Sequence, residues 1–225
     1  MFKAVVATCL LALSTALCQA APIVGVTGTS NTGDFNTASG FSTLNETLDF
    51  TNISGNDLTD TTTNGFGWFS DGSAGYPVIN TYDLGGVYSL ARFGFWNASA
   101  PDSTPLAAFG LRDVVIEWSL DNVNYNPLTG AGFSLVGLYT FAQSSDGQGQ
   151  PAEIVNFGAV TAQYFRFTVL TDYNNAGFPS YQALVFDSLD PSAPELNPAA
   201  ATLPFAFMAT LLLAGATRRK SLPLG

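Results

Sequence analysis

The chain has no histidine, and both of its cysteines, Cys9 and Cys18, lie within the first twenty residues. The remaining residues therefore offer no imidazole base, no thiol nucleophile, no disulfide and no cysteine-bound metal. Catalysis would have to come from a pair of carboxylates, and nothing in the sequence marks such a pair. We therefore expect that the protein is not an enzyme.

Positive charge is also scarce: Lys and Arg number 7 against 17 Asp and Glu, which gives a net charge of −10. The positive residues at the two ends are Lys3, Arg218, Arg219 and Lys220, and those between them are Arg92, Arg112 and Arg166. So acidic a surface repels phosphate backbones, and we expect no nucleic-acid partner. We expect Arg112 and Arg166 to form structural ion pairs with some of the many carboxylates.

The first segment, residues 1–20, has the features of a secretory signal peptide. Lys3 precedes an apolar run over residues 4–17, and Cys18-Gln19-Ala20 gives a small-x-small cleavage pattern before Ala21. Attachment of a lipid at Cys18 is the alternative, but Leu17 stands where that processing requires a small residue. The sequence therefore predicts an exported protein whose domain begins at Ala21.

The chain ends with a predicted transmembrane helix over residues 199–217, a run without charge that is long enough to cross a bilayer. Arg218, Arg219 and Lys220 follow at once, and such positive flanks stay on the cytoplasmic side. Residues 218–225 would then form a basic cytoplasmic tail, with the domain on the outer side of the membrane.

The linker before this helix, residues 191–198, contains Pro194 and Glu195. A Pro-Glu motif, an apolar helix and a terminal basic cluster together resemble the PEP-CTERM sorting signal of bacterial surface and exopolysaccharide-associated proteins. The resemblance implies processing by an exosortase, a membrane transpeptidase that is thought to cut near the motif. Leu196 departs from the family, which usually has proline there. A plain single-span anchor is the alternative.

Between these ends, residues 21–190, the pattern is one of short alternating strands separated by turn residues. In residues 114–120 every second side chain is apolar, including Trp118 and Leu120, as in a half-buried strand. The residues from Asp121 to Asn124 that follow are typical of a turn. Residues 79–84, 90–96 and 163–170 repeat the pattern, whereas the Gly-rich residues 62–76 are expected to be a loop. We predict an all-β domain with Trp96 and Trp118 in its core.

A series of short motifs follows in order along this domain: Asp83-Leu84-Gly85, Leu90-Ala91-Arg92-Phe93, Val114 to Asn122, Tyr125 to Leu128, Ile154 to Gly158 and Ala162 to Phe167. The succession resembles the coagulation factor 5/8 type C, or discoidin, domain of the galactose-binding-like superfamily. The resemblance implies an antiparallel β-sandwich jelly roll of about eight strands. It also implies binding loops at one end that recognise sugars, lipids or proteins.

The same resemblance implies a calcium site near an Asp-Gly-x-x-x-Thr segment. Asp60 matches the family aspartate, but Thr61 replaces the glycine, and Ala183 stands where a late glutamate would close the site. Calcium prefers six to eight oxygen ligands, so the loss of a carboxylate weakens or empties the site. Calcium binding is left open, with Asp60 as the one named ligand.

Aromatic residues in two loops are the candidate ligand-binding residues: Phe66, Trp68 and Tyr76 in the first loop, and Tyr173 and Phe178 in the second. An exposed ring offers a flat apolar face on which a sugar can stack. For Trp68 the alternative is that it fills the end of the core. We expect a cell-surface or matrix protein that binds carbohydrate such as exopolysaccharide, or a non-catalytic structural protein of the surface or biofilm matrix that binds other proteins.

Overall fold

The computed structural model describes residues 21–48, 50, 53, 58–61, 66–100, 105–134, 137–146 and 149–189. The predicted signal peptide, the sorting motif Pro194 and Glu195, the segment 199–217 and the basic flank of Arg218, Arg219 and Lys220 all lie outside these ranges. In the ranges that are described, no helix has the length and apolar character needed to cross a membrane.

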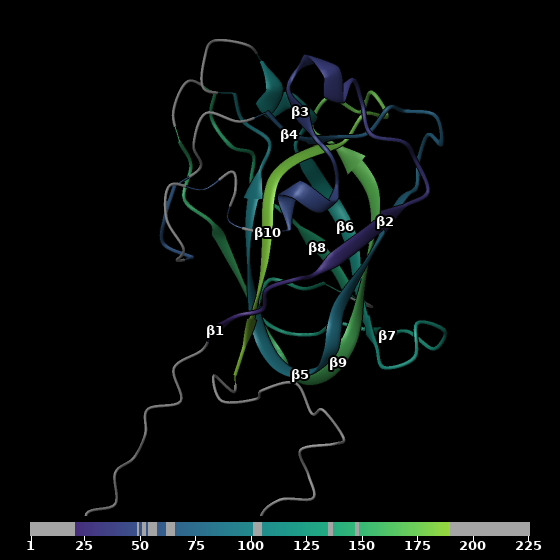
Figure 1. Cartoon of the computed structure of the whole chain (residues 1–225), viewed down its shortest axis with the longest axis vertical. Helices are drawn as coiled ribbons and strands as arrows, with labels where there is room; N and C mark the ends of the chain where they lie inside the picture. The colour runs from purple at the N-terminus through teal and green to yellow at the C-terminus, as the bar shows by residue number, and fades with distance from the viewer. Residues whose placement is uncertain are drawn as a thin grey trace, which may run out of the picture.

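The regular secondary structure of the described residues is β-strand, apart from three short 3₁₀ helices (Figure 1). The elements are β1 (Ala21–Pro22), β2 (Thr27–Ser30), η1 (Thr37–Ser39), β3 (Phe41–Ser42), η2 (Asn45–Thr47), β4 (Phe66–Phe69), β5 (Val78–Asn97), η3 (Leu106–Phe109), β6 (Leu111–Ser119), β7 (Asn126–Pro127), β8 (Leu138–Thr140), β9 (Glu153–Asp172) and β10 (Ser180–Ser188). All strand pairs are antiparallel except β3 with β4.

The strand pairing forms a sandwich of two layers that share β5 and β9. In the first layer, β2, the first half of β5, the second half of β9 and β6 lie side by side, with β7 and β8 on β6. In the second layer, β4, β10, the second half of β5 and the first half of β9 are paired, with β3 on β4 and β1 on β10.

Both shared strands bend between the layers at the bottom of Figure 1. At this corner Asp83 faces Tyr164 and Tyr88 faces Ala162, so β5 has extra residues between the two pairs. Gly85 lies in the corner with a φ of 76°, a left-handed conformation that is costly for other residues. A bulge of this kind increases the local bend and twist of a strand.

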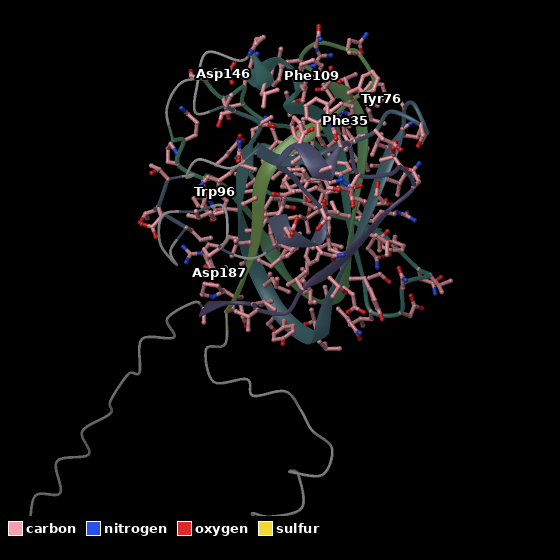
Figure 2. The ribbon with its side chains drawn as sticks, turned by 45° about the horizontal axis from the view of Figure 1, so that its top comes forward. Phe35, Tyr76, Trp96, Phe109, Asp146 and Asp187 are labelled. Atoms are coloured by element: carbon pink, nitrogen blue, oxygen red, sulfur yellow. The ribbon has the colours of Figure 1, made fainter. Side chains whose placement is uncertain are left out.

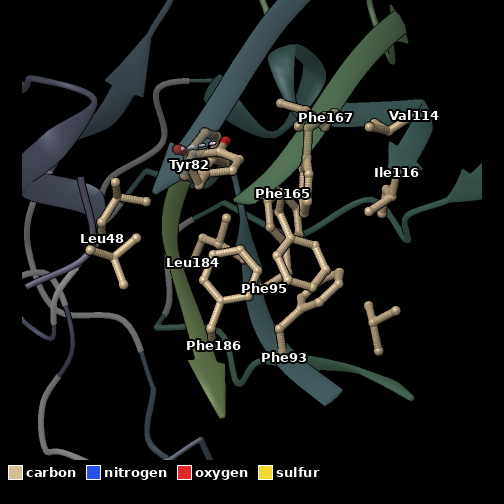
Figure 3. Close-up of a cluster of buried hydrophobic side chains, with 14 of the residues drawn as sticks. Leu48, Tyr82, Phe93, Phe95, Val114, Ile116, Phe165, Phe167, Leu184 and Phe186 are labelled. Atoms are coloured by element: carbon tan, nitrogen blue, oxygen red, sulfur yellow. Dashed lines mark hydrogen bonds between the residues drawn. The ribbon is translucent and has the colours of Figure 1, made fainter. Parts of the chain in front are cut away.

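The core lies between the layers and is rich in aromatic rings (Figure 3). Tyr82 and Phe167 of the first layer meet edge to face with ring centroids 5.2 Å apart. Phe165 of the first layer packs on Phe186 of the second at 4.8 Å. Aromatic pairs at these distances add about 0.5–1.5 kcal/mol each to the free energy gained from burial. The layers are therefore joined by packed rings as well as by the shared strands.

The outer face of the second layer is also covered, because a second apolar cluster lies there. Trp96 and Val185 pack with Leu58 and Ile53, which belong to the connection between η2 and β4. Every residue of β10 is consequently buried. A strand buried on both faces shows no clean alternation in sequence, and the 180–188 strand was not among those predicted.

The all-β prediction is confirmed, and several details of it are corrected. The strands predicted at 79–84 and 90–96 are one continuous strand, β5. Residues 66–69 of the predicted loop form β4, because they pair with both β3 and β10. Leu120 is 52% exposed, since β6 ends at Ser119, whose hydroxyl accepts the backbone N–H groups of Asp121 and Asn122 and starts the turn. The described residues form ten strands, where about eight were expected.

Candidate functional site

One end of the sandwich gathers five connections, and we call it the loop end. It consists of the described residues in 31–40, 70–77, 98–110, 141–152 and 173–179, at the top of Figures 1 and 2. The opposite end holds the β5 and β9 corner and the terminal strand pair, in which Ala21 faces Ser188. The loop end is therefore the end remote from residues 21 and 189.

Four phenylalanine rings meet at the loop end, and we call them the aromatic cluster: Phe35, Phe41 of β3, Phe69 of β4 and Phe109 of η3. Phe35 lies 5.4 Å from Phe41 and 5.5 Å from Phe69, and Phe69 lies 5.1 Å from Phe109. Phe69 is buried beneath the others, whereas Phe35 is 37% exposed and Phe41 and Phe109 are half-buried. The cluster thus presents apolar ring surface to solvent; Figure 2 shows Phe35 and Phe109 at this end.

Phe178 adds a further ring to the same end. Its side chain is 36% exposed and packs directly on Gly72, where an added Cβ would lie 2.4 Å from the ring. Gly72 has a φ of 72°, so glycine suits both its backbone conformation and the close approach of the ring. Gly72 therefore lets the 70–77 connection pack closely against the ring of Phe178.

Carboxylates hold these connections together, beginning with Asp71. Its Oδ1 accepts the Thr32 hydroxyl at 2.6 Å, the Gly33 N–H at 3.1 Å and the Ser73 N–H at 2.9 Å. These hydrogen bonds, that from Thr32 foremost, hold the pKa of Asp71 well below its usual range. Asp71 stays ionised and fixes the connection that carries Phe35 to the one that follows Phe69.

Asp146 and Asp172 have the same role elsewhere at the loop end. Asp146 accepts the N–H groups of Ala100 and Ala107, at 2.8 and 3.0 Å, and so anchors the connection that carries Phe109. Asp172 is fully buried and accepts the Tyr76 hydroxyl at 2.5 Å. Burial and this carboxylate raise the pKa of Tyr76, which keeps the hydroxyl protonated and donating.

A shallow cavity of about 170 Å³ lies at the loop end between β5 and the start of β9. It is lined by Phe95, Asn97, Ala142, Gln143, Ser144, Gln150, Pro151, Ala152 and Glu153. Gln143 donates to the carbonyl of Ala107, which links the cavity wall to the connection bearing Phe109. Glu153 accepts the Tyr139 hydroxyl at 2.7 Å and the Ala142 N–H at 2.8 Å. The cavity therefore offers amide and carboxylate groups at the loop end.

The predicted ligand-binding residues have different outcomes. Trp68 is fully buried, and its indole N–H donates to Asp34 at 2.8 Å. Of the two alternatives for Trp68, it therefore fills the end of the core and is not an exposed stacking ring. Tyr76 was expected to be exposed, but it is half-buried. Tyr173 is also half-buried and donates to the carbonyl of Phe141. Phe66 begins β4, and its side chain is outside the description; Phe178 is exposed, as predicted.

Around Asp60 the described residues supply apolar packing. The main-chain carbonyl of Asp60 accepts the Trp96 indole N–H at 3.1 Å, and Ala183 is buried with Trp96 and Leu58. Within the described ranges, no three side chains of His, Cys, Asp or Glu are grouped as metal ligands would be. Calcium also takes backbone and amide oxygens as ligands, so the predicted site at Asp60 stays a prediction. No part of the function proposed below is routed through calcium.

Sequence reasoning missed Phe35, Phe41 and Phe109, the accessible rings of the aromatic cluster. Phe35 and Phe41 flank the turn-rich residues 36–40, and Phe109 ends η3, two residues before β6 begins. The signal that could find them is an aromatic residue within a connection rich in Gly, Asn and Ser, the same pattern as in residues 66–76 and 173–178.

Two solved structures have a fold similar to that of this chain. CpGH89CBM32-5 from Clostridium perfringens, solved in complex with GalNAc-β-1,3-galactose, matches with a TM-score of 0.51 and 15% identity over 75% of this chain and 99% of the other. A putative chitobiase fragment from Bacteroides thetaiotaomicron matches with a TM-score of 0.50 and 20% identity over 78% of this chain and 96% of the other.

The described residues share the fold of these two structures. The β-sandwich that the discoidin resemblance implied is therefore confirmed at the level of the fold. No family model and no curated protein matches the chain. At these identities the likeness establishes the architecture of the domain, and the ligand must be argued from the loop end itself.

Proposed function

We propose that this chain is an exported, non-catalytic protein that binds carbohydrate through its loop end. The observation that carries the proposal is the aromatic cluster, whose partly exposed rings are held by fixed carboxylates on a sandwich shared with carbohydrate-binding modules. Ring faces accept the apolar C–H face of a pyranose, while carboxylate and amide oxygens accept its hydroxyl protons. CpGH89CBM32-5, the module of like fold, was solved with a disaccharide.

The position of the site suits a protein held at a surface. The loop end lies opposite residues 21 and 189, which lead to the predicted signal peptide and sorting segment. If the C-terminal segment anchors the chain, the loop end faces away from the membrane, toward extracellular polysaccharide. Export, processing by an exosortase at Pro194 and Glu195, and residence at the cell envelope or in the matrix are parts of this proposal.

The test of sugar binding uses the full-length chain, purified in a mild detergent and applied to a panel of immobilised polysaccharides. We expect saturable binding, weakened at least tenfold by Phe35→Ala or Phe178→Ala, which is about 1.4 kcal/mol. Leu120→Ala and Val123→Ala remove side chains that are 52% and 76% exposed at the opposite end, and they should leave binding unchanged. Phe35→Tyr keeps a ring and should retain most of the affinity.

Two other results would count against the proposal. Absence of binding across the panel would favour the structural matrix protein, whose contacts are with other proteins. Equal losses from variants at both ends would place the binding surface elsewhere. Parallel assays with calcium and with a chelator test the predicted site at Asp60, because only a calcium-dependent protein loses affinity in the chelator.

A further inference from the structure

Three of the rings at the loop end, Phe35, Phe109 and Phe178, belong to connections that also hold a carboxylate. Asp34 precedes Phe35, and the connection bearing Phe35 is also bound to Asp71. Asp146 anchors Ala107, two residues before Phe109. Asp172, which precedes the Phe178 connection, accepts the N–H of Ala176 at 3.2 Å. A ligand that lies on these rings therefore lies among negative charges.

The arginine side chains of the domain are all engaged in ion pairs. Arg92, Arg112 and Arg166 are the only basic side chains between residues 4 and 217, and all three are ion-paired. Arg92 bonds Asp187 at 2.5 Å, and Arg166 bonds Glu117 at 2.8 Å on a face of the first layer. Each guanidinium is thus neutralised by its own carboxylate.

Arg112 is the guanidinium nearest the loop end, because it follows the residue that faces Asp172. It bonds Asp113 at 3.0 Å, and Asp113 also accepts the hydroxyls of Thr171 and Thr140, both at 2.8 Å. The Thr hydroxyls keep Asp113 in place beside the guanidinium. An incoming anion would have to compete with this fixed internal carboxylate for Arg112.

The negative charges at the loop end distinguish acidic glycans from neutral ones. A carboxylate or sulfate on a glycan would be repelled by the loop-end carboxylates and would find no uncommitted cation among the described residues. A hydroxyl group, in contrast, is a donor that carboxylate oxygens accept well. Repulsion between exposed charges weakens as salt is added, whereas ring stacking and hydroxyl hydrogen bonds depend on salt much less.

We propose that the loop end recognises neutral, hydroxyl-rich glycans and discriminates against glycans that carry carboxylate, sulfate or phosphate groups. This inference rests on the proposed function and specifies the class of sugar that the same site accepts. It assigns the loop-end carboxylates two roles, since they fix the connections and also set the charge of the ligand.

The experiment compares polymers that differ only in charge. One pair is guar galactomannan and the same polymer with its C6 alcohols oxidised to carboxylates; the other is polygalacturonate and its carboxyl-reduced, uncharged form. Binding of the full-length chain is measured at about 10 mM and about 150 mM salt, where the Debye length is about 30 Å and about 8 Å. We expect the neutral member to bind at least tenfold more tightly at low salt, and the difference to shrink at higher salt.

A charge variant sharpens the test. Asn174→Lys places a cation on an exposed residue of the loop end, and should raise affinity for the acidic members by about threefold at low salt. Val123→Lys makes the same change of net charge at the opposite end and should have no such effect. Affinity for the neutral members should be the same in both variants.

The outcomes separate the inference from the proposed function. Tight binding of an acidic member, equal to or above that of its neutral partner, would overturn the neutral preference while leaving a carbohydrate-binding protein. Binding of neither member of either pair, together with no binding across the polysaccharide panel, would overturn both. An equal gain from Asn174→Lys and Val123→Lys would show that net charge, rather than the loop end, selects the ligand.

Discussion

At the scale of the residue, the hydroxyl pair of Tyr82 and Tyr181 is a fully buried polar contact between the layers. The two oxygens are 3.1 Å apart and both side chains are fully buried. Burial raises the pKa of each phenol above its ordinary value near 10. Because the folded pKa lies above the unfolded one, the stabilisation is complete below about pH 10 and is lost as pH rises past that value.

We therefore predict a pH-dependent effect of Tyr82→Phe. Near pH 7 the variant loses a hydrogen bond and should be less stable by about 1 kcal/mol. Near pH 11 the difference in free energy of unfolding between the variant and the parent protein should be smaller, since the variant has one phenol fewer to ionise on unfolding. Urea unfolding at both pH values measures this; a gap that is the same at both would contradict the linkage.

The ion pair of Arg92 and Asp187 supports a second prediction at this scale. Asp187 is 2% exposed, and one of its oxygens has no hydrogen-bond partner. The ion pair with Arg92 therefore offsets most of the free-energy cost of burying this carboxylate. Arg92→Met should cost about 3 kcal/mol, because it leaves a buried carboxylate unpaired. The double variant with Asp187→Asn should cost less than the sum of the two single changes. Arg112→Met, at an exposed pair, should cost under about 1 kcal/mol.

The sequence predicted residue roles where the cause is local. The pairing of Arg112 with Asp113 and of Arg166 with Glu117 follows from the excess of carboxylates around few arginines. The choice between an exposed and a buried Trp68 could not be made in the same way. Its burial depends on the pairing of β4 with β10, where Tyr181 faces Trp68 across more than a hundred residues of sequence.

At the scale of the element, β4 depends on a close approach to β10. A Cβ on Gly67 would lie 2.0 Å from the carbonyl oxygen of Tyr181, a backbone atom that cannot move aside cheaply. Gly67→Ala should therefore destabilise the protein by about 1–3 kcal/mol through overpacking. It should also weaken glycan binding, because Phe69 and the aromatic cluster are positioned by β4.

Gly158→Ala in β9 is the matched control, since its nearest neighbour atom would be 3.8 Å from the new Cβ. Unfolding by urea with near-ultraviolet circular dichroism reports on both variants. If the two variants unfold at the same denaturant concentration, β4 is not held as tightly against β10 as the structure indicates.

Alternation of apolar residues predicted the central strands well, because strands such as β6 have one core face and one outer face. It could not predict that residues 79–84 and 90–96 belong to one bent strand. The bend passes through Gly85 and Gly86, which read as a turn between two strands, and the continuity is set by pairing with β9. The loop end was predicted as a region from the fold, but its exposed rings depend on how five connections meet.

At the scale of the whole molecule, the 17 acidic side chains against 7 basic ones should destabilise the compact state by mutual repulsion. We predict that the melting temperature rises as sodium chloride increases from about 10 mM to about 150 mM, because the Debye length falls from about 30 Å to about 8 Å. Choline chloride should give the same curve, since screening depends on ionic strength and not on the cation. A rise with one salt alone would indicate specific ion binding.

The pairing of β1 with the end of β10 has a mechanical consequence. A force applied between residues 21 and 189 pulls on neighbouring strands at the same end, so it peels apart the two residue pairs of β1 and β10 one after the other. A force applied between the loop end and residue 189 acts along β10, whose hydrogen bonds to β5 run from Tyr181 to Ser188 and are loaded together. A polymer that pulls on the loop end therefore loads the sandwich in its resistant direction.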